Sequence, residues 1–217
     1  ISTDKAVEPS SYMGASKRAA EIYIQNLDID TKNTSFITVR FGNVLGSTGS
    51  VVSLFQSQIE RGGPITVTDK EATRFFMSVK EAVELVLISL TQTMEKNEKG
   101  GISVLNMGQP INIDNLSRQM IRLSGLTPGK DIKIKYTGLR AGEKRYEKLF
   151  YDDENQIKTE HPDIIIAKCR EFNLKSVEEM IEQIDQYIHK NQFTETINIL
   201  KKLVPEFSID NKIQVEK

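Results

Sequence analysis

The chain has 217 residues, of which 38% are hydrophobic and 27% charged, so it has enough apolar material to fold and general disorder is excluded. Its formal net charge of −1 gives no reason, from bulk electrostatics, to expect nucleic acid or a membrane surface as a partner. The single cysteine, Cys169, excludes an internal disulfide framework and a multi-cysteine zinc site, and it fits a reducing compartment. No run of residues approaches the roughly 18 apolar residues of a membrane span, and we find no signal peptide.

Helical and strand patterns alternate along the chain. Pro9, Ser10 and Ser11 can start a helix, because their small hydroxyl side chains cap free amide groups. In chain order the sequence predicts a helix over 12–25, a strand over 35–41, a helix over 51–61, a strand over 65–68, a helix over 79–94, a strand over 102–106, a helix over 113–124, a strand over 132–136, and helices over 177–189 and 194–203. This alternation predicts an α/β fold with a largely parallel sheet.

The sequence lacks the glycine-rich turn that holds the pyrophosphate in dinucleotide-binding domains. No G-x-G-x-x-G motif occurs, and the glycines between Gly42 and Gly49 are spaced too irregularly to replace it. The chain also opens on Ile1-Ser2-Thr3, without methionine, and these residues look like the end of a buried strand. We therefore expect a C-terminal half whose dinucleotide-binding half is missing, and we expect this half alone not to retain NAD.

Chemically competent side chains cluster near the N-terminus. Thr3, Asp4 and Lys5 follow the first strand, and Met13 and Lys17 lie four residues apart, on one face of the next helix. A hydroxyl, a carboxyl and two amines would then meet in one cleft, where an adjacent acid and amine can catalyse an elimination. The structural alternative is that Thr3 and Asp4 cap a helix with exposed basic residues.

Polar side chains at strand ends and in glycine-bearing loops are candidate ligand contacts. Arg40 and Asn43 flank the end of a predicted strand, a common binding position in open α/β sheets, although a simple strand-to-turn transition explains them equally well. Arg74 and Arg140 have guanidinium groups that suit phosphate oxygens, and Glu143 can accept from ribose hydroxyls. Taken singly, each arginine is more simply a solvated surface residue.

We expect no metal site. His161 and His189 lie far apart in the sequence, at no spacing typical of metal ligands. The acidic run Asp152, Asp153 and Glu154 is predicted to be a solvated turn.

Several longer strings occur in a fixed order along the chain. They are I-S-T-D-K-A-V-x-P-x-x-x-M-G-A-S-K-R, R-F-G-N-V-L-G-S-x-G-S-V, G-G-P-I-T-V-T, T-R-F-F-M-S, N-M-G-Q-P-I, G-L-R-A-G-E-K and the closing L-V-P-E-F. In this order they resemble the polysaccharide-biosynthesis family of extended short-chain dehydrogenases/reductases over essentially the whole chain. The similarity is greatest to the long, membrane-anchored UDP-N-acetylglucosamine 4,6-dehydratases.

The resemblance implies the C-terminal half of an extended Rossmann-type fold with a smaller α/β substrate-binding domain. Residues 1–47 would belong to the Rossmann-type domain and carry the active-site strand and helix. Residues 48–150 would mainly bind the nucleotide sugar and return strands to the Rossmann sheet, and residues 151–217 would form a C-terminal helical segment. The implied cofactor is NAD or NADP, held mainly by the missing half.

The implied reaction converts a UDP-N-acetylhexosamine, expected to be UDP-N-acetylglucosamine, to its 4-keto-6-deoxy product through transient hydride transfer to NAD. Lys5 would remove the C5 proton and Asp4 would protonate the departing C6 hydroxyl. Thr3 would hydrogen-bond the sugar O4, and Lys17 would contact the nicotinamide ribose. Met13 stands where related dehydrogenases carry the tyrosine of Tyr-x-x-x-Lys, and this departure is itself similar to the long dehydratases.

The resemblance also implies binding residues, a location and partners. Arg40 would join Lys17 at the cofactor. The expected partner is a UDP-sugar, with a homo-oligomer left open, and full-length relatives are anchored at the cytoplasmic face of the inner membrane by N-terminal helices absent here. The residues assigned to the UDP-sugar are Asn43 and Arg74 at the diphosphate, Arg140 and Glu143 at the diphosphate and ribose, and Ser50 and Val51 at the uridine pocket.

Two alternatives stay open at this point. A UDP-sugar 4-epimerase of the same architecture would not need the Asp4-Lys5 pair to remove the C6 hydroxyl, so the pair favours dehydration. A non-catalytic substrate-binding fragment is the second alternative, because the glycine-rich turn is missing.

Overall fold

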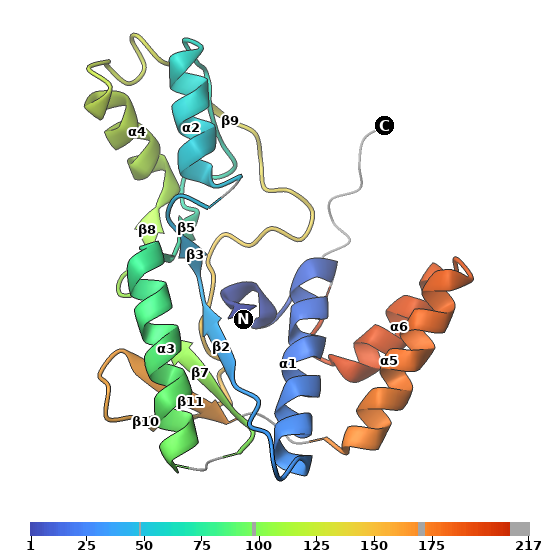
Figure 1. Cartoon of the computed structure of the whole chain (residues 1–217). Helices are drawn as coiled ribbons and strands as arrows, with labels where there is room; N and C mark the ends of the chain where they lie inside the picture. The colour runs from blue at the N-terminus through green and yellow to red at the C-terminus, as the bar shows by residue number, and fades with distance from the viewer. Residues whose placement is uncertain (48, 97–98, 169–171, 209–217) are drawn as a thin grey trace.

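A computed structural model describes residues 1–47, 49–96, 99–168 and 172–208 (Figure 1). Cys169, which bears on the exclusion of disulfides, lies outside the described residues. Within the described part, a five-stranded sheet and its helices form a larger lobe. Two two-stranded sheets and the helices α2 (Val51–Glu60) and α4 (Ile113–Leu123) form a smaller lobe.

The larger sheet has the strand order β1-β2-β7-β11-β10. β1 (Ser2–Thr3), β2 (Thr38–Phe41) and β7 (Gly101–Leu105) run parallel, which confirms the predicted α/β fold with a parallel sheet. β11 (Ile164–Lys168) is antiparallel to β7, and β10 (Asn155–Lys158) forms the far edge. The C-terminal segment predicted to be helical therefore contributes two strands as well.

Helices α1 (Tyr12–Asp30) and α3 (Val79–Lys96) lie on opposite faces of this sheet (Figure 1). The side chains of β7 alternate between these faces: Leu105 packs with Leu85 of α3, whereas Val104 belongs to a cluster on the other face. A parallel sheet covered on both faces in this way is typical of α/β proteins.

Helix α1 is longer than predicted. The sequence predicts its end at Gln25, but the helix continues to Asp30 because polar side chains near its end are used in tertiary contacts. The carboxylate of Asp28 accepts from the backbone N–H of Phe36 at 2.8 Å and from that of Gly100 at 2.9 Å. These bonds fix the helix end against the strands that follow.

Helices α5 (Leu174–His189) and α6 (Phe193–Leu203) form a hairpin beside α1 (Figure 1). Asn173 caps α5 by accepting from the backbone N–H of Ser176. The hairpin and α1 share a core of buried residues, which are Ala15, Ile22, Val177, Leu203, Val204 and Phe207.

The smaller lobe contains two short strand pairs, β4 (Ile65–Val67) with β9 (Ile134–Tyr136) and β5 (Thr73–Arg74) with β8 (Ile111–Asn112). A third pair, β3 (Asn43–Val44) with β6 (Phe76–Met77), packs with the core of the larger lobe, because Val44 and Met77 share a cluster with Leu85 and Leu105. Helices α2 (Val51–Glu60) and α4 (Ile113–Leu123) begin where the sequence predicts and contact β4. The apolar faces of these elements enclose Phe55, Ile59, Ile65, Val67, Ile121 and Ile132.

Candidate active site

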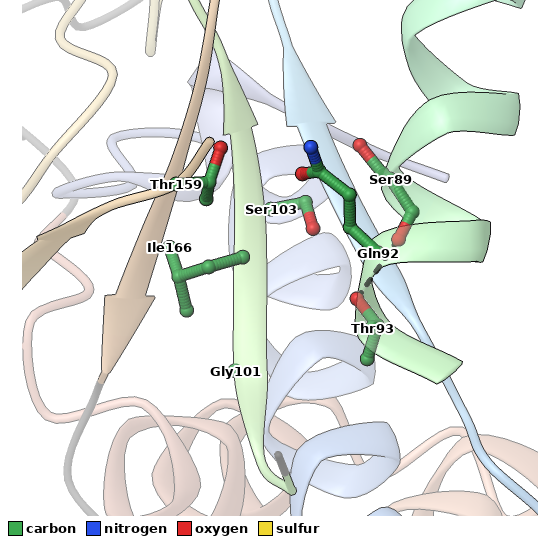
Figure 2. A pocket seen from close by; sticks show the side chains of 7 residues that line it. All are labelled: Ser89, Gln92, Thr93, Gly101, Ser103, Thr159 and Ile166. Carbon is green, nitrogen blue, oxygen red and sulfur yellow. Dashed lines mark hydrogen bonds between the residues drawn. The ribbon is translucent and has the colours of Figure 1, made fainter. Parts of the chain in front are cut away.

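A small cavity lies between α3 and the strands β7 and β11 (Figure 2). Its volume is about 30 Å³, which suits a water molecule and is far too small for a nucleotide. Gln92 Oε1 is buried here without a hydrogen-bond partner among the described residues. The residues that line it are Ser89, Gln92, Thr93, Gly101, Ser103, Thr159 and Ile166.

A cleft of about 970 Å³ lies at the carboxyl ends of β1 and β2. This size matches sites for small organic ligands, and ligands of open α/β sheets bind at this edge. Its walls come from the turn after β1, the start of α1, the region around β3, the start of α2 and the segment 137–147. The sequence-predicted residues in its lining are Lys5, Met13, Asn43, Ser50, Val51, Arg74, Arg140 and Glu143.

The charges in this lining are unbalanced. Four side chains are basic and two are acidic, although the whole chain carries almost no net charge. An excess of positive charge inside a cleft attracts an anionic ligand such as a diphosphate. The basic residues are Lys5, Arg74, Arg140 and Lys144, and the acidic ones are Glu143 and Glu147.

The end of β1 brings Thr3, Asp4 and Lys5 together. A short 3-10 helix, η1 (Asp4–Ala6), starts here, and Thr3 caps it by accepting from the backbone N–H of Lys5 at 3.4 Å. Thr3 Oγ1 donates to Asp4 Oδ1 at 3.0 Å, and Lys5 Nζ lies 3.0 Å from the same oxygen. Thr3 therefore caps η1, as the structural alternative expects, and the same turn also brings the side chains of Thr3, Asp4 and Lys5 into contact.

Asp4 and Lys5 differ in their access to the cleft. The side chain of Lys5 is 29% exposed and lines the cleft, whereas that of Asp4 is fully buried and does not. The expectation that Asp4 protonates the sugar directly therefore needs correction. In this arrangement Asp4 can reach a ligand only through its neighbours, Lys5 and Thr3.

Two glycines allow this turn to pack closely. A Cβ atom on Gly42 would lie 2.8 Å from Cβ of Phe75 and 3.0 Å from Oδ2 of Asp4. A Cβ atom on Gly14 would overlap the carbonyl oxygen of Lys5. The buried position of Asp4 thus depends on glycine at position 42, and the contact of α1 with the turn depends on glycine at position 14.

Met13 and Lys17 do not face the same space. Met13 lines the cleft and is 49% exposed. Lys17 is exposed outside the cleft lining, and its Nζ donates to the carbonyl oxygen of Ile1 at 3.5 Å. Within the described part of the chain, β1 pairs only with β2, so Lys17 stands beside a free sheet edge.

Lys5 has two further neighbours, one of which the sequence did not reveal. Its Nζ donates to Oδ1 of Asn43 at 3.1 Å and lies 4.0 Å from Oε1 of Glu147. Oε2 of Glu147 lies 3.5 Å from Nζ of Lys144. Glu147 carries no local signal that separates it from an ordinary charged loop residue, and its partner Lys5 is distant in sequence.

Arg74 and Glu143 meet although they come from different segments. Nη2 of Arg74 lies 2.8 Å from Oε1 of Glu143, which also accepts from Oγ1 of Thr68 at 2.9 Å. Oε2 of Glu143 accepts from the backbone N–H of Arg140 at 3.2 Å. The side chain of Glu143 thus links Arg74, Thr68 and the backbone of Arg140 on the wall of the cleft.

Arg40 is not a cleft residue. Its side chain is fully buried, where it donates to both carboxylate oxygens of Glu21, at 2.9 and 2.8 Å, and to Glu154 at 2.9 Å. Burial by itself would raise the pKa of Glu21, but the Arg40 guanidinium holds that pKa below its ordinary value. The prediction that Arg40 contacts the cofactor is wrong, as is the prediction that Glu154 lies in a solvated turn, because both belong to a buried ion-pair network.

The chain is similar to known proteins over most of its length. A family model described as "Polysaccharide biosynthesis protein" matches residues 1–169. The capsular polysaccharide biosynthesis protein CapD of Staphylococcus aureus is 44% identical over 215 residues, covering 99% of this chain and 32% of CapD. A UDP-glucose 4-epimerase of Rickettsia bellii (strain OSU 85-389) is 37% identical over 156 residues, covering 71% of this chain and 43% of the epimerase.

A solved structure supports the same relationship. The X-ray structure of Pen from Bacillus thuringiensis matches with a TM-score of 0.66 and 36% identity, covering 77% of this chain and 51% of Pen. The chain thus spans 32% to 51% of the length of these three proteins. Among the described residues, none of the helices combines the length and the hydropathy needed to cross a membrane. With its parallel sheet, its cleft and these matches, the chain belongs to the polysaccharide biosynthesis protein family and has the fold of the extended short-chain dehydrogenases/reductases.

Proposed function

We propose that this chain is the substrate-binding and acid–base part of a UDP-N-acetylhexosamine 4,6-dehydratase that acts on UDP-N-acetylglucosamine in bacterial surface-polysaccharide synthesis. The observation that carries the proposal is the Asp4–Lys5 pair, 3.0 Å apart, at the carboxyl edge of a parallel sheet beside the cleft of about 970 Å³. The family and the similarity to CapD support a role in polysaccharide synthesis.

The cleft offers a separate group for each part of a UDP-sugar. Arg74 and Arg140 supply the positive charge that a diphosphate needs, and Glu143 supplies acceptors for ribose hydroxyls. Ser50 and Val51, at the start of α2, form the proposed uridine end of the cleft. The sugar then extends toward Lys5 and Met13.

NAD or NADP is the proposed cofactor, and when bound it would take a hydride from the sugar C4 and later return it to C6. Lys17 would hold the nicotinamide ribose, because its amine is exposed beside the free edge of β1. The pyrophosphate would be held by a glycine-rich turn outside this chain.

Thr3, Asp4 and Lys5 form a path for one proton. The proton of the sugar O4 passes to Thr3 as the ketone forms, and Thr3 passes its own proton to Asp4 along their 3.0 Å hydrogen bond. Lys5, which is 29% exposed, releases its ammonium proton to solvent at this stage, so Asp4 holds one proton beside a free amine, and Lys5 takes a proton back from solvent at the end of the cycle. A single shift along the 3.0 Å contact exchanges this state with the Asp4–Lys5 ion pair.

The ketone at C4 makes the C5 proton acidic, and Lys5 removes it. The C5–H electrons form a C5–C6 double bond while the C6–O bond breaks, and Lys5 gives the same proton to the leaving hydroxyl, which departs as water. Lys5 is then an amine again. When C6 is reduced, Lys5 protonates C5 with the proton stored on Asp4. The C5 proton has then left in the water molecule, and the proton from the sugar O4 has taken its place at C5.

Two other functions remain candidates. The relative from Rickettsia bellii that is named UDP-glucose 4-epimerase favours epimerisation at C4. The missing glycine-rich turn favours a binding fragment without activity of its own. Neither function needs an acid–base pair at Lys5, which is why we prefer dehydration.

Product analysis tests the proposal. The complete protein, meaning this chain joined to a dinucleotide-binding half, is incubated with UDP-N-acetylglucosamine and the product is identified by NMR. The proposal expects a 4-keto-6-deoxy sugar, and a C4 epimer with its C6 hydroxyl intact would contradict it. This chain alone should bind UDP in calorimetry without retaining NAD, and failure to bind UDP would contradict its role as the substrate half.

A further inference from the structure

Glu147 is a buried acid that none of the proposed steps uses. It follows the G-L-R-A-G-E-K string, in the segment that leads from β9 back to the large sheet (Figure 1). Its side chain is only 4% exposed, yet it belongs to the lining of the cleft. It lies between two ammonium groups, at 4.0 Å from Lys5 and 3.5 Å from Lys144.

Burying this carboxylate has a free-energy cost that its contacts offset only in part. Oε2 of Glu147 has no hydrogen-bond donor among the described residues, and the two ion pairs are its compensation. Asp4, Lys5, Glu147 and Lys144 together carry two negative and two positive formal charges. A neutral cluster of four charged groups beside a ligand cleft is costly as a purely structural feature and is typical of functional sites.

The distances around Lys5 show what Glu147 can do. Two of the three ammonium N–H bonds are directed to Asp4 at 3.0 Å and Asn43 at 3.1 Å. Glu147, at 4.0 Å, is too far away for a hydrogen bond but close enough for charge attraction. It therefore attracts Lys5 into the cleft while leaving one N–H direction for a ligand.

Lys144, the second ammonium group beside Glu147, contacts the turn that carries Lys5. Its Nζ donates to the carbonyl oxygen of Val7 at 2.6 Å, directly after the turn that carries Asp4 and Lys5. The segment with Glu143 and Glu147 is thereby tied to that turn. The segment with the proposed nucleotide contacts and the turn with Lys5 are therefore joined through Lys144.

From this geometry we propose that Glu147 is a positioning residue for Lys5, which it keeps at the place where the sugar C5 and C6 lie. The inference rests on the proposed function for the identity of the reacting atoms. It assigns Glu147 no contact with the reacting atoms, so its effect is expected on turnover rather than on substrate binding.

The test compares Glu147→Gln with Glu71→Gln in the complete protein. Glu147→Gln keeps the shape of the side chain and removes its charge. Glu71 is a control because its exposed side chain pairs with Arg145 and does not line the cleft. We expect Glu147→Gln to lower kcat about 100-fold, as for a misplaced catalytic group, with KM and the Kd for UDP nearly unchanged. Glu71→Gln should change none of these values, and Glu147→Asp should recover part of the lost kcat because it restores the charge.

A crystal structure of Glu147→Gln provides a second readout that does not depend on activity. The inference expects Nζ of Lys5 to leave hydrogen-bond distance of Asn43, while Arg74 and Glu143 stay in place. An unmoved Lys5, an unchanged kcat, or a raised KM at constant kcat would each overturn the inference. If the unmodified protein makes no 4-keto-6-deoxy product, the proposed function is wrong. The positioning role of Glu147 is still tested in that case, by whether Lys5 moves in the crystal structure of Glu147→Gln.

Discussion

Nη2 of Arg74 lies 2.8 Å from Oε1 of Glu143, and this ion pair joins strand β5 to the segment that follows β9. The side chains are 11% and 24% exposed, so the pair is shielded from solvent more than a surface salt bridge is. Both residues line the cleft, where a diphosphate and a ribose would compete for the bonds that they now make with each other. Ligand binding should therefore depend strongly on Arg74.

Replacing Arg74 with methionine should weaken UDP binding by this chain about 10- to 100-fold, because a charged hydrogen bond contributes about 1.5–3 kcal/mol. Binding of uridine, which lacks the diphosphate, should change little. Calorimetry with both ligands measures the difference. Arg122→Met, on the exposed surface of α4, is the matched control and should leave the affinity for UDP unaltered.

Replacing Asp4 with asparagine should lower kcat of the complete protein at least about 100-fold, the usual contribution of a proton-transfer group. The substitution keeps the shape of a fully buried side chain and removes its negative charge together with its capacity to hold a proton. KM should stay nearly constant, because Asp4 does not line the cleft. Asp152→Asn, at an 87% exposed side chain, is the control, and equal kcat values for the two variants would exclude Asp4 from the proton path.

Replacing Glu21 with glutamine should lower the free energy of unfolding by about 3–5 kcal/mol, because it leaves the buried Arg40 without its main counter-charge. Glu84→Gln, at an exposed pair with Lys80, should change it by no more than about 1 kcal/mol. Urea unfolding of both variants measures these values. Similar effects at the two sites would contradict the view that the Arg40 network supports the fold.

The contribution of Glu21 should disappear in acid. Its pKa is lowered in the folded chain by Arg40, so the stabilisation is complete above its ordinary pKa and is lost as pH falls through the lowered value. The difference in unfolding free energy between the unmodified chain and Glu21→Gln should therefore shrink at acid pH. A difference that stays constant from neutral to strongly acid pH would show that the Glu21 carboxylate does not carry the effect.

Most regular elements with strong local patterns could be predicted from the sequence; the exception is β11, whose apolar run Ile164–Lys168 lies in the segment expected to be helical. Helices α2 and α4 begin at the predicted residues, because apolar residues at helical spacing follow a capping Ser50 or Asn112. Strand β10 was missed because Asn155–Lys158 is a mostly exposed edge strand with no alternating apolar pattern. Its place depends on pairing with β11, which no local pattern specifies.

Lys5, Arg74 and Glu143 line one cleft, and their assigned roles there stay predictions. Burial is a property of the whole fold, so the sequence could not show that Asp4 lies behind Lys5 or that Arg40 is enclosed by Glu21 and residues far along the chain.

Running the reaction of the complete protein with UDP-N-acetylglucosamine in heavy water tests most directly whether Lys5 transfers a proton to C5. Lys5 is 29% exposed, so its protons exchange with solvent, and the proton returned to C5 should carry the solvent label. We expect a 4-keto-6-deoxy product that has lost the elements of water and contains deuterium at C5. A product that keeps the mass of the substrate, with no deuterium at C5 and an inverted C4, would contradict this expectation.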